Sequence, residues 1–169
     1  MSEVSVKELL ERLLGAPDAR NLSSDLLDGA ERMFTARGQG AHARWMRLER
    51  DGYGARTEAT NLRDVLGADA PDEVVRSALD SRSQYGRVVV GGVVRQWPHF
   101  FVEGVDEMRR WEQRVGSSGG PSTIELEFEL PLGERGPRAL SFDRSIFRRV
   151  LYNIALEVGT ALQSIASDR

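Results

Sequence analysis

The sequence predicts an α+β fold: a helical N-terminal half, then a small and mostly antiparallel sheet, then a long C-terminal helix. Apolar residues recur at helical spacing as far as about residue 84. Beyond that point β-branched residues and a strict alternation are typical of strands, about four in all, and the final segment returns to helical spacing. A chain of 169 residues is long enough to bury one core. We therefore expect a single domain over 1–169, with a helical part at about 1–84 and a sheet-plus-helix part at about 85–169.

About five short helices are expected in the N-terminal half, and the first two have clear boundaries. Ser5 and Glu8 have the spacing of a capping box, and Gly15 ends the helix that follows. A second helix begins near Ser23 or Ser24. Both segments carry apolar residues at the spacing of one buried face.

Three further short helices complete the N-terminal half. The third covers 41–50, with Trp45 directed inward. The fourth lies around 62–66 and ends at Gly67. The fifth follows Pro71, which suits the first position of a helix because its missing N–H has no intrahelical partner there.

The strands are predicted from two local patterns. RVVVGGVV, residues 87–94, is rich in β-branched residues, and Gly91-Gly92 suits a two-residue hairpin turn. TIELEFELPL, residues 123–132, alternates apolar and acidic residues, and RALSF, residues 138–142, is its expected partner. These segments predict a mostly antiparallel sheet.

Two helices are expected after the first hairpin. Residues 105–115 carry apolar side chains on one side, and GSSGGPS, residues 116–122, follows as a loop. The longest helix covers about 143–166 and packs on the sheet. Its apolar residues share one half of a helical wheel: Ile146, Phe147, Val150, Leu151, Ile154, Ala155, Val158, Leu162 and Ile165.

Composition excludes several classes of function. The chain contains no cysteine, so disulfides, thiolate metal sites and cysteine nucleophiles are impossible. Its first residues carry acids where a signal peptide needs basic residues, and no apolar run approaches the length of a membrane span. Of 23 basic residues all but Lys7 are arginine, which is typical of a GC-rich, most often bacterial, genome. We expect a cytoplasmic bacterial protein without a membrane partner.

The segment VVRQWPHFFVEG, residues 93–104, holds one of only two histidines. In an extended conformation Arg95, Trp97 and His99 share one face. Pro98 cannot donate to a ladder, which favours an edge strand. An edge strand with these three side chains would recognise a peptide or a base by stacking and cation–π contact. In the alternative, the aromatic residues belong to the core and His99 is a boundary residue with its hydrogen bonds satisfied.

No constellation of residues indicates catalysis. A catalytic His99 would need a nucleophile or a paired acid, and the nearby Glu103 has no diagnostic spacing. There is no H-E-x-x-H motif, no Walker motif and no dinucleotide fingerprint. We therefore predict no catalytic, metal or cofactor site, and a protein that is not an enzyme on its own.

An arginine-rich segment leaves a nucleic-acid function open. Residues 31–63 carry 7 arginines against 4 acids, although the whole chain has a net charge of -3. A helix with these arginines outward could lie on a nucleic-acid backbone. The candidate contacts are Arg37, Arg44, Arg47 and Arg50 within the segment 37–63. The alternative prediction is therefore a nucleic-acid-binding regulator.

The C-terminal helix carries three unusual residues on its polar side. Arg149, Tyr152 and Leu156 fall close together there, and arginine and tyrosine are enriched in interfaces. A chain without visible chemistry acts by contact. The sequence thus predicts a regulatory or assembly module that binds a protein partner or a second copy of itself. The predicted partner-binding residues are Arg95, Trp97, His99, Arg149, Tyr152 and Leu156.

Overall fold

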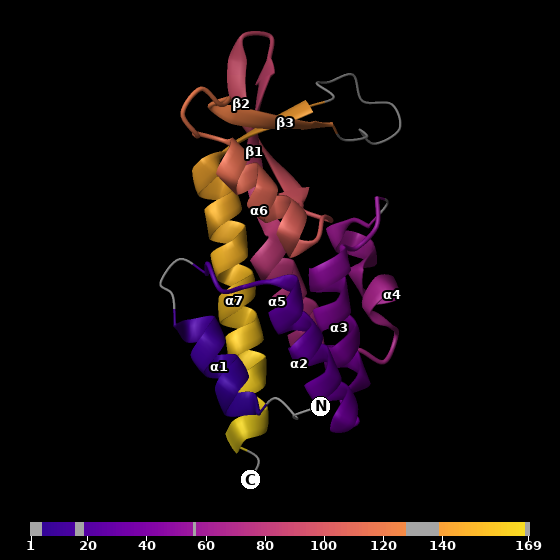
Figure 1. The fold of residues 1–169 in the computed structure, drawn as a ribbon. Coiled ribbons are helices and arrows are strands. Elements are labelled where there is room, and N and C mark those ends of the chain that lie inside the picture. The colour runs from indigo at the N-terminus through magenta and orange to yellow at the C-terminus, as the bar shows by residue number, and fades with distance from the viewer. Residues whose placement is uncertain (1–4, 16–18, 56, 128–138, 168–169) are drawn as a thin grey trace.

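A computed structural model describes residues 5–15, 19–55, 57–127 and 139–167, and it confirms the α+β architecture. The sheet lies at one end of an elongated molecule and the helices form the rest (Figure 1). The helices are α1 (Val6–Leu14), α2 (Ser24–Ala36), α3 (Gly40–Asp51), the 3-10 turn η1 (Ala59–Asn61), α4 (Leu62–Leu66), α5 (Asp72–Arg82), α6 (Val105–Arg114) and α7 (Arg144–Ser167). The strands are β1 (Ser83–Val90), β2 (Val93–Phe100), β3 (Thr123–Glu127) and β4 (Ala139–Asp143).

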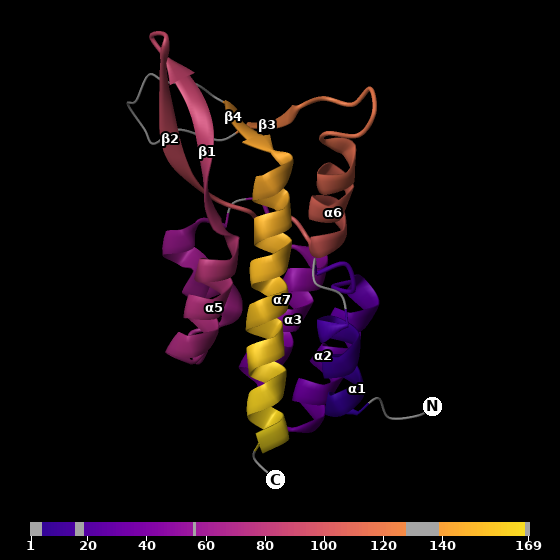
Figure 2. The same cartoon turned by 90° about the vertical axis from the view of Figure 1, so that its left-hand side faces the viewer.

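The described strands form one antiparallel sheet in the order β2-β1-β4-β3. β1 and β2 make a long hairpin that projects away from the helices (Figures 1 and 2). Its turn residues Gly91 and Gly92 have φ of 57° and 80°, as a two-residue hairpin turn requires. The predicted hairpin is thus confirmed, and β1 begins at Ser83, earlier than the sequence pattern indicates.

α7 is the central helix of the molecule. It follows β4 directly, and the Asp143 side chain accepts hydrogen bonds from the backbone N–H groups of Ser145 and Ile146, which caps the helix. α7 packs along α5, α6 and α1 (Figure 2). Only its first turns lie beside the sheet, so most of its apolar face meets other helices.

One hydrophobic core runs from the helices into the sheet. Phe142 of β4 and Phe147 of α7 are buried at the junction, and Phe101 packs against both. Gly86 of β1 lies against the Phe142 ring, where a Cβ atom would come within 2.7 Å of a ring carbon. A glycine is therefore required at this crossing of β1 over the core.

Most predicted boundaries agree with the structure. Ser5 and Ser23 are the N-caps of α1 and α2. Pro71 precedes α5 as its N-cap and is not its first helical residue, because its ψ of 147° is extended. The predicted strand 123–132 is confirmed as far as Glu127, and its remainder lies outside the described residues.

Among the described residues, none of the helices combines the length and the apolar character that a membrane span needs.

Candidate protein-interaction surfaces

A fully buried ion pair anchors the base of the β1–β2 hairpin. Arg82, the last residue of α5, donates to Glu49 of α3 through two nitrogens, with N–O distances of 2.6 and 2.8 Å. The other oxygen of Glu49 accepts hydrogen bonds from Trp45 Nε1 and Tyr53 Oη. The Arg82 guanidinium also lies 4.7 Å from the centre of the Tyr53 ring. Both buried charges are therefore paired and hydrogen-bonded, as burial demands.

Arg82 also holds the chain as it leaves the hairpin. Its Nη1 donates to the carbonyl oxygens of Phe101 and Glu103, at 2.8 and 2.6 Å. Its own carbonyl accepts from the Phe101 N–H at 3.3 Å. One side chain thus connects α3, the end of α5 and the segment that follows β2. This network positions the hairpin relative to the helices.

β2 is an edge strand, because no described strand pairs with its outer side. The Phe101–Arg82 backbone bond fixes which residues of β2 face β1, since hydrogen-bonded and non-hydrogen-bonded pairs alternate along an antiparallel ladder. By this alternation Val94, Gln96 and Pro98 direct their backbone polar groups outward. Pro98 suits such a position because it has no N–H to donate. We call the outward groups of Val94, Gln96 and Pro98 the β2 edge.

The outer face of the hairpin is apolar and exposed. Tyr85, Val89 and Val94 have exposed fractions of 60%, 63% and 62%. The register pairs Tyr85 with Pro98 and Val89 with Val94, so these side chains form two apolar cross-strand pairs. Val93, on the opposite face near the turn, is 58% exposed. Large exposed apolar groups gathered beside an open edge are typical of a binding surface.

The three predicted residues of β2 lie in different environments. Arg95 is exposed, whereas Trp97 and His99 are half-buried. The register places all three on the side of the hairpin that also carries the buried Val88. The structure therefore brings them together on one face of an edge strand, as the sequence predicts. His99 also belongs to the boundary of the core, because its ring lies 4.8 Å from Phe101 and 5.3 Å from Phe142.

His99 is a neutral residue in this setting. Its Nε2 is buried and has no hydrogen-bond partner among the described residues. Burial lowers the pKa of His99 to about 4. No acid or nucleophile bonds to it in the part of the chain that the structure describes, and no three metal-ligating side chains converge there.

The predicted residues of the C-terminal helix form a second exposed surface. Tyr152 and Leu156 have exposed fractions of 45% and 47%, and Arg149 is exposed one turn before them. These exposed side chains show that the elements packed along α7 leave this part of its surface open. We call Arg149, Tyr152 and Leu156 the α7 stripe. It is distant in sequence from the β2 edge and much less apolar than the hairpin face.

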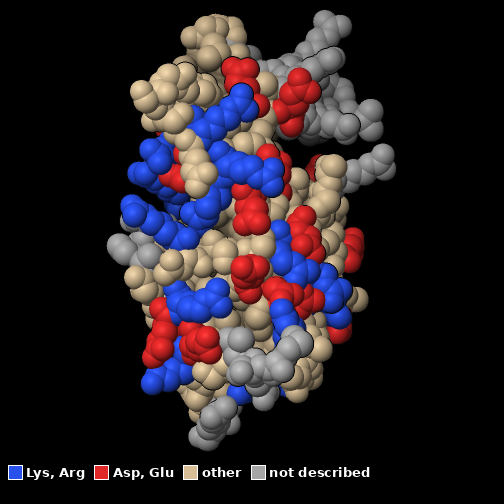
Figure 3. Space-filling model, viewed as in Figure 1, with Lys and Arg blue, Asp and Glu red and all other residues tan. Residues whose placement is uncertain are grey.

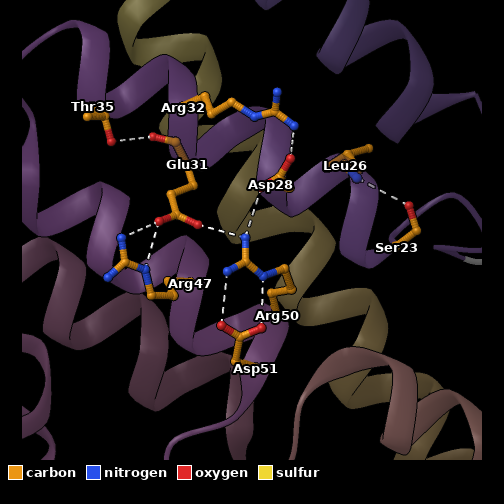
Figure 4. Close-up of polar contacts among 9 residues, drawn as sticks. All are labelled: Ser23, Leu26, Asp28, Glu31, Arg32, Thr35, Arg47, Arg50 and Asp51. Carbon is orange, nitrogen blue, oxygen red and sulfur yellow. Dashed lines mark hydrogen bonds and ion pairs between the residues drawn. The ribbon is translucent and has the colours of Figure 1, made fainter.

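The arginines of α3 are engaged within the chain. An open groove between α2 and α3 contains Glu31, which lies between Arg47 and Arg50 (Figure 4). Arg50 also pairs with Asp28 and Asp51 at 3.1 and 2.8 Å. The charges of the groove therefore neutralise one another, and the hydrogen bonds and charge of Asp51 raise the pKa of Arg50 despite its burial.

The other two candidate nucleic-acid contacts are also occupied. Arg44 donates to the Leu66 carbonyl and pairs with Asp69 at 2.6 Å. Arg37 donates to the Ile165 carbonyl near the end of α7. The structure thus does not gather these four arginines into an open basic face, and basic and acidic side chains alternate over α2 and α3 (Figure 3).

Basic side chains do gather elsewhere, over α6 and the first turns of α7 (Figure 3). Arg144 and Arg148 both donate through Nε to one oxygen of Glu112, at 2.9 and 2.8 Å. Burial acts to raise the pKa of Glu112, but these hydrogen bonds outweigh it and lower the pKa. Arg110 and Arg114 extend the patch along the exposed side of α6. The sequence does not reveal this patch because its two halves lie about thirty residues apart.

Comparison with models of protein families, with curated proteins and with solved structures finds no match to this chain.

Sequence reasoning missed the residues that carry the hairpin surface. Tyr85, Val89 and Val94 belong to an apolar run, which is also the pattern of a strand buried on both faces. Exposure depends on what packs against the strand, and the local pattern does not specify this. The Arg82–Glu49 pair was missed because charged residues at helical spacing indicate a solvated face. The only available signal for an open edge was Pro98, which the sequence analysis used.

Proposed function

We propose that this chain is a cytoplasmic, non-enzymatic interaction module of the regulatory or assembly type, and that it binds a protein partner through the β2 edge. The observation that carries the proposal is the projecting hairpin, which combines large exposed apolar side chains with backbone groups that pair with no described strand. Such an edge accepts an additional strand, because backbone hydrogen bonds supply affinity and the neighbouring side chains supply specificity.

The buried network supports this proposal because it makes the hairpin a fixed platform. Arg82 holds the base of the hairpin through the carbonyl groups of Phe101 and Glu103. A preordered strand loses less conformational entropy when it binds than a mobile one does. The exposed face is therefore available without a folding step.

The occupied arginines favour a protein partner over nucleic acid. Arg44, Arg47 and Arg50 each have a carboxylate partner in the chain. Binding to phosphate would require these ion pairs to break, which removes most of the electrostatic gain. The absence of cysteine suits a reducing compartment.

A photo-crosslinking residue at Val94 tests the proposal in the native cell. We expect a discrete adduct with a polypeptide, because Val94 lies at the β2 edge and is exposed. The matched control places the same residue at Arg76, which is exposed on α5 away from the sheet. In a chain that also carries Gln96→Pro the Val94 adduct disappears, because this change removes an outward N–H. If Val94 gives no more adduct than Arg76, the proposal is wrong.

A further inference from the structure

We infer that the β2 edge pairs with the β2 edge of a second copy of this chain, in an antiparallel register centred on Gln96. The inference rests on the proposed function, since it names the partner of the same edge. A two-fold axis through Gln96 would join the two sheets into one continuous sheet. Such an interface is isologous, so each subunit contributes the same surface.

The backbone groups of the β2 edge complement themselves in this register. Gln96 exchanges both backbone hydrogen bonds with the partner's Gln96, because these outward-facing residues stand directly opposite. The N–H of Val94 donates to the carbonyl of the partner's Pro98, and by two-fold symmetry the N–H of the partner's Val94 donates to the carbonyl of Pro98. Pro98 acts only as an acceptor here, so each of the two Val94–Pro98 pairs has one backbone hydrogen bond and the Gln96 pair has two.

The side chains of the core-side face complement themselves as well. The register places Arg95 opposite the partner's Trp97, and Trp97 opposite the partner's Arg95. Such a non-hydrogen-bonded pair brings the side chains close, and a guanidinium over an indole ring is the most favourable cation–π pair. Arg95 is exposed and Trp97 is half-buried.

The exposed apolar groups of the outer face also come together. Val94 would lie beside the partner's Pro98. Within each subunit Val94 already pairs with Val89, and Pro98 with Tyr85. The four side chains would therefore form one apolar row in the order Val89, Val94, the partner's Pro98 and the partner's Tyr85. Two-fold symmetry gives two such rows, and each row contains side chains of both subunits. Pairing would thus shield side chains that have exposed fractions near 60% in the single chain.

Neighbouring registers fit less well. If Val94 faced the partner's Gln96, Arg95 would stand opposite the partner's Arg95, and directly opposed like charges are destabilising. If Val94 faced the partner's Val94, Arg95 would stand opposite the partner's Val93 and Trp97 opposite a glycine of the turn. Of these three registers, only the one centred on Gln96 pairs each Arg95 side chain with the ring of the partner's Trp97.

The molar mass of the purified chain, measured by light scattering or sedimentation over a wide concentration range, is the first test. We expect twice the 18.8 kDa of one chain. Gln96→Pro should halve the mass, whereas the control Gln96→Val, which keeps the backbone donor, should leave it unchanged. Tyr152→Arg/Leu156→Glu alters the α7 stripe and should also leave the mass unchanged. Circular dichroism checks that each variant is folded.

A cysteine scan of this cysteine-free chain reads the register directly. Residues in a hydrogen-bonded antiparallel pair have Cα atoms about 5.5 Å apart, within reach of a disulfide. Gln96→Cys should therefore oxidise to a covalent dimer, and Val94→Cys and Arg95→Cys should not. The wild-type and cysteine variants are compared at equal concentration under mild oxidation.

Three results would overturn the inference: a monomeric wild type, a dimer that Gln96→Pro leaves intact, or a disulfide that forms from Arg95→Cys in place of Gln96→Cys. A dimer lost only in Tyr152→Arg/Leu156→Glu would assign self-association to α7. If the chain is a monomer and the Val94 adduct contains a different polypeptide, the second copy is excluded while the proposed function stands. If Val94 gives no adduct at all, both are wrong.

Discussion

At the scale of single residues, Glu49 is a fully buried carboxylate held by three side chains. One of its carboxylate oxygens accepts from Trp45 and Tyr53, and the other accepts from Arg82. Burial and the neighbouring Glu49 carboxylate raise the pKa of Tyr53 well above its usual value, so its hydroxyl stays protonated and donates. The network contains no spare acceptor, and losing one member leaves another buried group unpaired.

We expect Arg82→Met to lower the free energy of unfolding by about 3–5 kcal/mol, because it leaves the Glu49 carboxylate buried without its cation. Urea denaturation followed by circular dichroism measures this change. The double variant Arg82→Met/Glu49→Leu should lose less than the sum of the two single variants, because it removes both charges. Single variants within about 1 kcal/mol of wild type would contradict the assigned role.

His99 makes stability depend on pH in a defined window. Its pKa is about 4 in the folded chain and near 6.5 when unfolded, so between these values the unfolded state binds more protons. Stability is therefore lost as the pH falls from about 6.5 to about 4. We expect the wild type to lose about 3 kcal/mol more than His99→Phe between pH 7 and pH 4.

The comparison uses His99→Phe because phenylalanine keeps the ring contacts with Phe101 and Phe142. Burial also lowers the pKa of His42, but that residue is present in both chains and its effect cancels. The measurement is urea denaturation at several pH values. Parallel losses in the two chains would show that His99 is more accessible to water than the structure indicates.

The residue scale also shows what sequence can and cannot specify. Ser5, Ser23 and Gly67 were assigned correctly because caps act within one turn of a helix. Arg82 and Glu49 lie 33 residues apart in sequence, and no local rule pairs them. The exposure of Val94 also depends on the tertiary fold, because it is set by what packs against β2. Local chemistry was therefore predictable, and long-range pairing was not.

At the scale of elements, the β1–β2 hairpin is defined by its turn. Gly91 and Gly92 both have positive φ, and a Cβ atom at either would meet no neighbouring atom. Only the backbone conformation thus restricts these positions. Asparagine tolerates the left-handed conformation better than other residues, and Asn-Gly is a favoured pair in such turns.

We expect Gly91→Asn to leave the hairpin intact, and Gly92→Val to destabilise it by about 1–2 kcal/mol because a β-branched residue resists positive φ. Amide hydrogen exchange of β1 and β2 reports this directly, since the hairpin projects from the body and can open locally. Equal protection in the two variants would indicate a different turn.

At the scale of the whole molecule, charge is arranged in two different ways. Over α2 and α3 the arginines and carboxylates neutralise one another, whereas over α6 and α7 the arginines form a patch around Glu112 (Figure 3). The sequence analysis located the basic excess of residues 31–63 correctly and could not show that it is paired. Pairing depends on Asp28 and Asp69, which the fold brings to the arginines.

This arrangement predicts the response to nucleic acid. We expect no binding of single-stranded or duplex oligonucleotides at physiological ionic strength. Any weak binding at low salt should fall in Arg110→Ala/Arg114→Ala and stay unchanged in Arg44→Ala/Arg47→Ala. Fluorescence anisotropy at several salt concentrations measures both. If Arg44→Ala/Arg47→Ala instead flattens the salt dependence, the arginine-rich helix is a nucleic-acid contact after all.

The way the strands join the helices also sets the order of folding. β1 continues from α5 and β4 continues into α7, and the described pairing of β1 with β4 is limited to Arg87 with Ser141. Each outer pair closes locally: β1 with β2 across a two-residue turn, and β3 with β4 within about twenty residues. Local contacts form early because little loop entropy opposes them. We therefore expect the hairpin to form before α7 docks on α5 and the two halves of the sheet are joined. A chain that folds in this order exposes its β2 strand to other chains before the core is complete.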